Sequence, residues 1–246
     1  MNKIKKFVKY IIPQKCLKII IELKQFLIDV YANKSYSQEG EDMILRRIFE
    51  KQKTGFYIDV GAHHPKRFSN TYYFYKKKWR GVNIDAMPGS MKLFQKIRPR
   101  DINLEIAISD KAQELTYFLF NEPALNTFSK PLSEKRDGKG EYKACKKIKI
   151  KTFTLEKVLN DYLLENVEID FLSIDVEGLD FQVLKSNNWY KYKPKIILIE
   201  DLDFSFNNLK NSNIYKFLTD KDYQLLTKTL NTLIFINKEY YNSRDS

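Results

Sequence analysis

The sequence predicts an α/β protein built on an open, doubly wound and mostly parallel β-sheet that ends in a C-terminal antiparallel hairpin. Three patterns lead to this fold class. Strand-like and helix-like segments alternate between residues 56 and 200. The strand-like segments are continuous apolar runs, which is typical of strands covered by helices on both faces. Two further runs, YQLLTKTL and TLIFIN, follow each other closely near the C-terminus and predict the hairpin.

Composition and charge limit the class of protein. Of the 246 residues, 43% are apolar and 30% are charged, as in an ordinary soluble globular protein rather than a collagen-like or disordered one. The net charge of +12 favours anionic partners such as nucleic acid, anionic lipid or a phosphorylated small molecule. Two cysteines, two histidines and no CxxC motif exclude a Cys/His zinc site. Because Cys16 and Cys145 are far apart in the chain, we expect reduced thiols and a cytoplasmic location.

Residues 1–34 are predicted to form a basic amphipathic N-terminal helical segment in front of a domain that spans residues 35–246. Residues 3–31 contain seven lysines and two acidic residues. No run of 18 apolar residues occurs, so no membrane span is expected. After Pro13 the apolar residues follow a helical stripe. Two roles stay open for this helix. It packs on the body of the protein or on a second subunit of a homo-oligomer, or it makes peripheral contact with an anionic membrane surface.

The first half of the larger domain is predicted to alternate helix and strand. Ser37, followed by acidic residues, predicts the N-cap of a first helix. FYIDV at residues 56–60 is a short apolar run and predicts a buried strand. The next elements in chain order are a helix over residues 69–79, a strand over 81–85, a helix over 88–97 with Pro88 in its first turn, and a strand over 102–109.

The second half resumes this alternation after an irregular region. Residues 114–120 and 147–153 are β-like runs, and the basic segment EKRDGKGEYKACKK between them predicts a mobile loop or lid. The elements that lead from there to the hairpin are a helix over residues 154–165 that begins at or just before Thr154, strands over 169–175 and 195–200, and a helix over 211–219.

Acidic residues lie within or at the end of the predicted strands, at the sheet edge where ligands bind in doubly wound folds. They are Asp59, Asp85, Asp175 and Glu200. Gly61 follows the first strand without the further glycines of G-x-G-x-x-G, and no Walker loop occurs, so the sequence predicts neither a dinucleotide nor a nucleoside triphosphate cradle. The acids of the first two strands and the glycine favour a ligand that joins adenosine to an amino acid, as S-adenosylmethionine does.

These segments resemble the FkbM-type family of S-adenosylmethionine-dependent methyltransferases. The resemblance covers about residues 35–237 and is carried by YSQEGEDMIL, FYIDVGAHHP, GVNIDAMP, IAIS, FLSIDVEGLD and KIILIED. IDVGA and IDVEG, at the ends of the first and fourth predicted strands, are the most diagnostic pair. The chain departs from the family at two places. His63, His64 and Pro65 follow IDVGA where the family often has Asn and a further Gly, and Asp85 stands where the family often has Glu.

The resemblance implies a seven-stranded, Rossmann-like methyltransferase sheet whose parallel part has the strand order 3-2-1-4-5. It also implies O-methylation of a hydroxyl, commonly on a sugar or a polyketide-derived scaffold, and it assigns the contacts of S-adenosyl-L-methionine. These contacts are Asp59, Gly61 and Ala62 beside the methionine part, Asp85 at the ribose, Ala107, Ile108 and Ser109 near the adenine, Gln38 and Glu39 closing over the cofactor, and Asp175 at its amino-acid end.

Two groups of residues are candidates for removing the proton of the hydroxyl. His64 lies in the turn after the first strand, and its unperturbed pKa of about 6.5 suits a base. Asp175 and Glu177 follow the fourth strand and are the second catalytic candidates. With Glu200 they also offer oxygen ligands for Mg²⁺ or Mn²⁺, which would acidify the hydroxyl. Each group has a structural alternative, because one of the histidines, or the acids, would instead cap the following helix.

The resemblance therefore implies an O-methyltransferase that acts on a small-molecule sugar, and we expect a nucleotide-activated sugar or a surface-glycan unit in polysaccharide biosynthesis. The basic residues 135–151 are either a solvated surface or a grip for the diphosphate of such an acceptor. A nucleic-acid methyltransferase is one alternative. We expect no nucleic-acid partner, because the N/D-P-P-Y/F signature and a Pro-Cys nucleophile do not follow the fourth strand. A non-catalytic protein that binds anionic surfaces is the other alternative.

Overall fold

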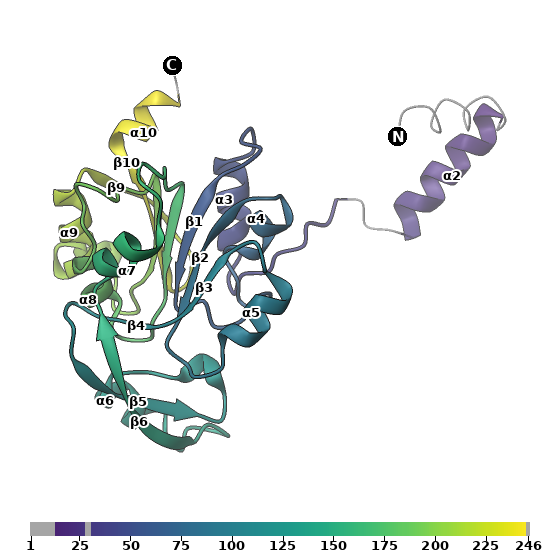
Figure 1. Cartoon of the computed structure of the whole chain (residues 1–246). Helices are drawn as coiled ribbons and strands as arrows, with labels where there is room; N and C mark the ends of the chain where they lie inside the picture. Colours follow the sequence, from purple (N-terminus) through teal and green to yellow (C-terminus); the bar gives the residue numbers. More distant parts are fainter. Residues whose placement is uncertain (1–12, 28–30, 245–246) are drawn as a thin grey trace. The chain divides into compact units, whose positions relative to one another are not determined.

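The computed structural model describes residues 13–27 and 31–244. Contacts within the chain divide it into two units, Met1–Lys34 and Ser35–Ser246. In the first unit the described element is helix α2 (Gln14–Leu27) (Figure 1). Among the described residues, no helix is both long enough and apolar enough to cross a membrane.

The second unit is organised around a seven-stranded sheet. In spatial order its strands are β3 (Ile102–Glu105), β2 (Arg80–Asp85), β1 (Phe56–Val60), β7 (Phe171–Ile174), β8 (Ile196–Glu200), β10 (Thr232–Asn237) and β9 (Tyr223–Lys228). The pairs from β3 to β8 are parallel, whereas β10 is antiparallel to both of its neighbours. The predicted fold class is confirmed, including the order of the five parallel strands and the terminal hairpin.

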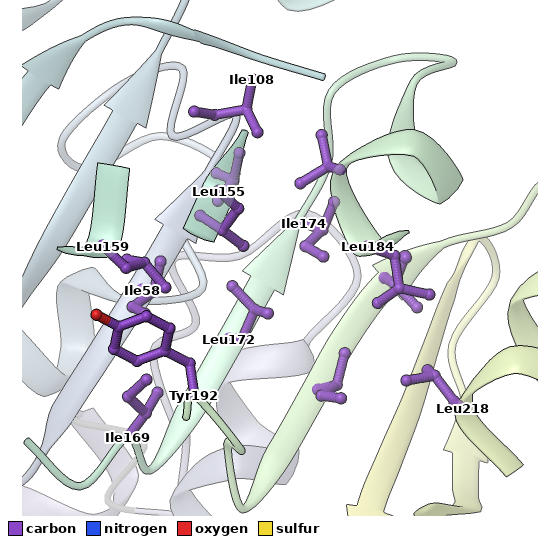
Figure 2. Close-up of a cluster of buried hydrophobic side chains, with 14 of the residues drawn as sticks. Ile58, Ile108, Leu155, Leu159, Ile169, Leu172, Ile174, Leu184, Tyr192 and Leu218 are labelled. Atoms are coloured by element: carbon purple, nitrogen blue, oxygen red, sulfur yellow. The ribbon is translucent and has the colours of Figure 1, made fainter. Parts of the chain in front are cut away.

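Helices cover both faces of this sheet. Successive residues of a strand point to opposite faces, so Tyr57 packs in one layer and Ile58 in the other. The Tyr57 layer includes α3 (Glu41–Ile48) and α4 (Tyr72–Lys76). The Ile58 layer, shown in Figure 2, includes α7 (Leu155–Tyr162), α8 (Asp180–Lys185) and α9 (Asn213–Asp220). Because both faces are buried, the central strands consist mainly of apolar residues, as in FYIDV of β1 and IILIE of β8.

The predicted strand over residues 102–109 is two strands in different sheets. β3 ends at Glu105, after which the backbone N–H of Ile106 donates to the carbonyl of Asp85 at 3.0 Å. β4 (Ala107–Ile108) then pairs with β6 (Ala144–Phe153), which is antiparallel to β5 (Glu114–Phe120) (Figure 1). The run INLEIAIS has one local pattern throughout, so the change of partner strand leaves no signal in the sequence.

Two helix predictions near the N-terminal end of the domain need correction. α3 begins at Glu41 with Gly40 as its N-cap at φ 88°, so Ser37 is not the N-cap. The Ser37 hydroxyl lies 3.2 Å from the Asp42 N–H, from which it accepts, and 3.0 Å from the Asp42 carboxylate, to which it donates. The helix predicted over residues 69–79 is confined to α4, and Lys78, with φ 70°, ends the helical conformation.

The basic segment predicted as a lid is partly built into regular elements. Helix α6 (Lys130–Arg136) enters it from one side, with its N-terminus capped by the Ser129 hydroxyl. β6 begins at Ala144, so residues 137–143 remain as the connecting loop. The sequence KPLSEKR has no apolar stripe that would indicate a helix. The other described helices are η1 (Pro123–Leu125), α5 (Met91–Ile97), η2 (Phe206–Asn211) and α10 (Lys238–Ser243).

Candidate active site

The turn after β1 passes closely against the turn after β7. Gly61 has φ 87°, and a Cβ atom at this position would overlap the carbonyl oxygen of Asp175. The N–H groups of Gly61 and Ala62 both donate to the carbonyl of Ile84, at 2.9 and 3.0 Å. The left-handed conformation and the close approach both require glycine, which explains the glycine of IDVGA.

Asp85 connects the turn after β1 with the turn after β2. One of its carboxylate oxygens accepts the N–H of His63 and the other accepts the N–H of Met87, each at 2.8 Å. The side chain is nearly buried, and this burial raises its pKa although both hydrogen bonds lower it. The carboxylate therefore orients two turns and also lines the cavity between them.

This cavity lies at the carboxyl ends of β1, β2 and β7. Its apolar lining comes mainly from β2, β4, β5 and the segments beside them, with Ile84, Ile106, Ile108, Tyr117 and Phe128. Its polar lining comes from the turns and from the segment before α3, with Gln38, His63, Asp85, Asp175 and Glu177. Such a lining suits a ligand that combines an apolar ring with hydroxyl and charged groups.

The two histidines after β1 have different surroundings. His64 is not part of the cavity lining, and its Nδ1 accepts the N–H groups of Lys66 and Arg67 at 3.0 and 2.9 Å. It thus caps the following turn, which is the structural alternative considered from the sequence. His63 lines the cavity, and its Nε2 is buried without a hydrogen-bond partner among the described residues. Burial, and then the charge of Arg67, lower the pKa of His63, so a neutral imidazole lies at the cavity.

Three carboxylates gather where β7 and β8 end. Asp175, Glu177 and Glu200 each offer an oxygen, and these oxygens lie within 4.8 Å of one another. Burial is the largest cause of a raised pKa for each of them. The pKa of Glu200 rises to about 8, with Glu177 and Asp180 as the next causes. Arg136 of α6 forms an ion pair with Glu177 and limits the rise of its pKa.

Asp175 separates the first cavity from a second, more polar one. Gln38, Phe68 and Asp175 line both cavities. The second cavity is completed by polar and acidic side chains, among them Glu39, Asn70, Glu200 and Thr232. Asp175 is accessible through these openings, yet it lies below the surrounding surface, so burial and then Glu200 raise its pKa well above the usual range.

The segment before α3 is fixed to the C-terminal hairpin. The Glu39 carboxylate accepts the Thr229 hydroxyl at 2.7 Å and the N–H of Asn231 at 2.9 Å. Glu41 accepts the Thr232 hydroxyl at 3.1 Å. Gln38 is thereby held at the edge of both cavities by a segment that precedes the sheet in sequence.

Asp59 lies behind the cavity rather than in its lining. The Thr71 hydroxyl donates to it at 2.7 Å, and Arg98 donates to the same hydroxyl at 2.9 Å. Burial raises the pKa of Asp59, and Arg98 opposes this rise. Asp59 therefore belongs to a buried polar network behind β1.

The residues assigned to the cofactor by resemblance fall into two groups. Those in the lining of the first cavity are Gln38, Gly61, Asp85, Ile108 and Asp175, and Glu39 lines the second cavity. Those behind the lining, each at most 6% exposed, are Asp59, Ala62, Ala107 and Ser109. Ala62 packs against Met91 and Phe94 of α5. Which of these residues contact a cofactor stays a prediction.

Sequence reasoning missed the residues that the β5–β6 ribbon and its connections bring to the site. Tyr117, Asn126 and Phe128 line the first cavity, and the rings of Tyr117 and Phe128 lie 4.4 Å apart. Arg136 reaches Glu177 across 41 positions in the sequence. No local motif marks these residues, because their position depends on how the ribbon folds over the strand ends. The basic composition of residues 134–147 was the one available signal for Arg136.

A comparison with known protein families adds to this geometry. A family model described as the methyltransferase FkbM domain matches residues 59–225. No curated protein matches the chain. The matched residues begin in β1 and include the two turns, Asp85 and the three carboxylates.

Proposed function

The chain belongs to the FkbM methyltransferase family, and we propose that it transfers a methyl group from S-adenosylmethionine to a hydroxyl of a sugar. The observation that carries this proposal is the cavity at the carboxyl ends of β1, β2 and β7, where an apolar lining adjoins a group of carboxylates. The first part suits the cofactor, and the second suits the removal of a proton from the acceptor.

The lining of the first cavity fits S-adenosylmethionine, which supplies an activated methyl group when it is bound. Ile106, Ile108 and Tyr117 provide an apolar surround for the adenine. Each Asp85 oxygen accepts one backbone N–H and keeps a lone pair for a ribose hydroxyl. The buried Nε2 of His63 lacks a partner, and a polar group of a bound ligand would satisfy it.

The chain's own contribution to the reaction is to hold the acceptor hydroxyl and to take its proton. Asp175 faces both cavities, so we place the hydroxyl in the second cavity and the methyl donor in the first. A base works best when its pKa lies near the working pH, and the pKa of Glu200, raised to about 8, meets this condition. Burial, and then Glu200, raise the pKa of Asp175 in the same direction. Arg136 holds Glu177 beside them. His63 is better placed than His64 for a histidine role at the cavity.

The same carboxylates fit a divalent cation. Asp175, Glu177 and Glu200 offer hard oxygen donors, as Mg²⁺ and Mn²⁺ prefer. Their mutual repulsion contributes to the raised pKa values, and a bound cation would relieve it. We propose that these three residues hold the ion, which would lower the pKa of the acceptor hydroxyl.

A sugar acceptor is supported by the chemistry of the second cavity. Amide and hydroxyl side chains of Gln38, Asn70, Asn231 and Thr232 line it together with the acids. Such groups bind several hydroxyls at once through hydrogen bonds. Nucleotide-activated sugars are therefore the first acceptors to test.

Cofactor binding is tested by calorimetry with S-adenosylhomocysteine. We expect Asp85→Ala to weaken binding by about 1–3 kcal/mol, because hydrogen bonds to two hydroxyls are lost. Glu165→Gln, an exposed site away from the cavity lining, is the control. Equal affinities of the native protein and Asp85→Ala would refute the assignment of Asp85 to the ribose.

Turnover is tested with labelled S-adenosylmethionine and a panel of nucleotide sugars, with and without EDTA. We expect Asp175→Asn and Glu177→Gln to lower turnover by about 100-fold or more while cofactor binding persists. His63→Ala and His64→Ala are compared in the same assay. If EDTA abolishes turnover and Mn²⁺ or Mg²⁺ restores it, the cation is required. Labelling of RNA instead of every sugar would overturn the proposed acceptor class.

A further inference from the structure

Three of the four lysines of β6 lie on the face of the β5–β6 ribbon that points away from the first cavity. Tyr117 of β5 pairs directly with Ile148 of β6, and directly paired residues share a face. Tyr117 lines the cavity. Because alternate residues of a strand point to opposite faces, Lys147, Lys149 and Lys151 belong to the other face. The register therefore argues against these lysines as a grip for an acceptor inside the cavity.

These three lysines, the lysine row, form no ion pair in the described part of the chain, and only Lys151 has an acidic strand partner, Glu114. All three are exposed. A strand rises about 3.3 Å per residue, so neighbouring charges of the row are about 7 Å apart. Lys143, in the loop just before β6, is also exposed.

The face of the lysine row offers charge but no fully exposed ring. The Nζ of Lys147 lies 5.4 Å from the ring centre of Phe118, which is only 6% exposed. The Nζ of Lys151 lies 5.5 Å from the ring centre of the half-buried Phe153. Proteins that hold single-stranded nucleic acid stack its bases on accessible aromatic rings. A ribbon of unpaired lysines without fully exposed rings suits the headgroups of an anionic bilayer better.

Helix α2 adds apolar chemistry that suits the same partner. Ile19, Leu23 and Phe26 are exposed by 54%, 52% and 87%, and their spacing places them on one side of the helix. Lys15 and Lys18 are exposed on the same helix. An apolar stripe with adjacent lysines is typical of helices that lie in the interface of an anionic membrane.

We propose that the protein docks on an anionic lipid bilayer through the lysine row, with the apolar stripe of α2 as a second contact. The row supplies attraction to the headgroups, and the stripe supplies apolar surface that enters the boundary of the acyl chains. The proposal does not depend on the acceptor or on methyl transfer, because the lysine row lies on the face opposite to the cavity.

The test is sedimentation of the full chain with vesicles of phosphatidylcholine that contain 30% phosphatidylglycerol, or none, at low ionic strength. We expect K147Q/K149Q/K151Q to reduce binding to the anionic vesicles on the order of 100-fold, since each lysine near such a surface contributes about 1 kcal/mol. The control K92Q/K96Q/K216Q removes the same charge from exposed lysines of α5 and α9. It should bind nearly as the native chain does, and no protein should bind the neutral vesicles.

Several results would overturn the proposal. Equal losses in the two lysine variants would mean that only net charge matters, and native binding by the row variant would exclude the row. If the protein binds neither kind of vesicle but binds an RNA oligonucleotide through the lysine row, the lysine row recognises nucleic acid. L23E/F26E should weaken vesicle binding by about tenfold or more. If it only converts a dimer to a monomer, as gel filtration would reveal, α2 binds a second copy of the chain instead.

Discussion

Arg98 and Asp101 form an ion pair with no exposed side-chain surface, and Arg98 also donates to the hydroxyls of Tyr57 and Thr71. Thr71 in turn donates to Asp59, so one buried cation organises the polar groups behind the first strand. The three carboxylates at the site lack a comparable arrangement, because Arg136 pairs with Glu177 alone. Arg98 thus compensates the charge of the buried network behind the first strand. At the acidic site, Arg136 compensates the charge of Glu177 but pairs with neither of the other two carboxylates.

Replacing Arg98 should be strongly destabilising. We expect Arg98→Met to lower the free energy of unfolding by about 3–5 kcal/mol, because Asp101 would remain buried without its partner. Urea denaturation provides the measurement. Arg47→Met removes the cation of an exposed pair with Glu50 and should cost about 0–1 kcal/mol. Similar losses in both variants would contradict a special role for the buried pair.

The raised pKa of Glu200 predicts a pH dependence of stability. Its pKa is about 8 in the folded protein and about 4.3 in an unfolded chain. Between these values the folded state binds a proton that the unfolded state has released, so this residue makes the protein less stable as pH rises from 5 to 8. We expect Glu200→Gln to reduce the fall in melting temperature between pH 5 and pH 8. The exposed control Glu165→Gln should leave this fall unchanged.

Melting temperatures measured at several pH values also test the cation site, without relying on activity. Mg²⁺ should raise the melting temperature more at pH 8 than at pH 6, because the carboxylates must lose their protons to bind the ion. A native protein and a Glu200→Gln variant with identical pH profiles would show that Glu200 does not titrate in this range.

At the scale of elements, the site depends on three turns that approach one another at the end of the sheet. The turn after β1 packs on the turn after β7 at Gly61, and Asp85 bonds it to the turn after β2. The β5–β6 ribbon then adds Tyr117 to the cavity and leaves its lysine row on the other face. The register between β5 and β6 therefore decides which of their residues belong to the site.

Gly61→Ala tests how closely the turns approach. Gly61 has φ 87° and Gly138 has φ 76°, but a Cβ atom would meet the Asp175 carbonyl at the first and nothing within 4 Å at the second. We expect Gly138→Ala to cost about 1 kcal/mol and Gly61→Ala clearly more, with loss of affinity for S-adenosylhomocysteine. Chemical denaturation and calorimetry measure both effects. Equal losses in the free energy of unfolding for the two variants would mean that the turns after β1 and β7 can move apart without a further energetic cost.

At the scale of the whole molecule, the chain divides into Met1–Lys34, which contains α2, and Ser35–Ser246, which contains the first cavity. The cavity lining begins at Gln38, within the second unit. The segment from Ser35 to Asp42 is itself tied down, since Asp42 accepts hydrogen bonds from the Ser35 and Ser37 hydroxyls. The N-terminal end of the second unit is therefore held by hydrogen bonds within that unit.

Removal of residues 1–34 should leave the second unit folded. We expect the shortened chain to keep its melting temperature within a few degrees and to bind S-adenosylhomocysteine as the full chain does, because the cavity is built from later residues. Calorimetry and turnover with a soluble acceptor provide the comparison. A shortened chain that remains folded but loses turnover would place the N-terminal helix in the active site.

The sequence by itself determined the alternation of strands and helices, the terminal hairpin and the acids at the strand ends. These features depend on local apolar periodicity and on the order of segments, both of which are visible in a single chain. Only the tertiary structure decided that residues 102–109 change sheets, that His63 rather than His64 lines the cavity, and that Arg136 meets Glu177. Each of these depends on which distant backbone lies alongside, and neighbouring residues with the same local pattern carry no record of that pairing.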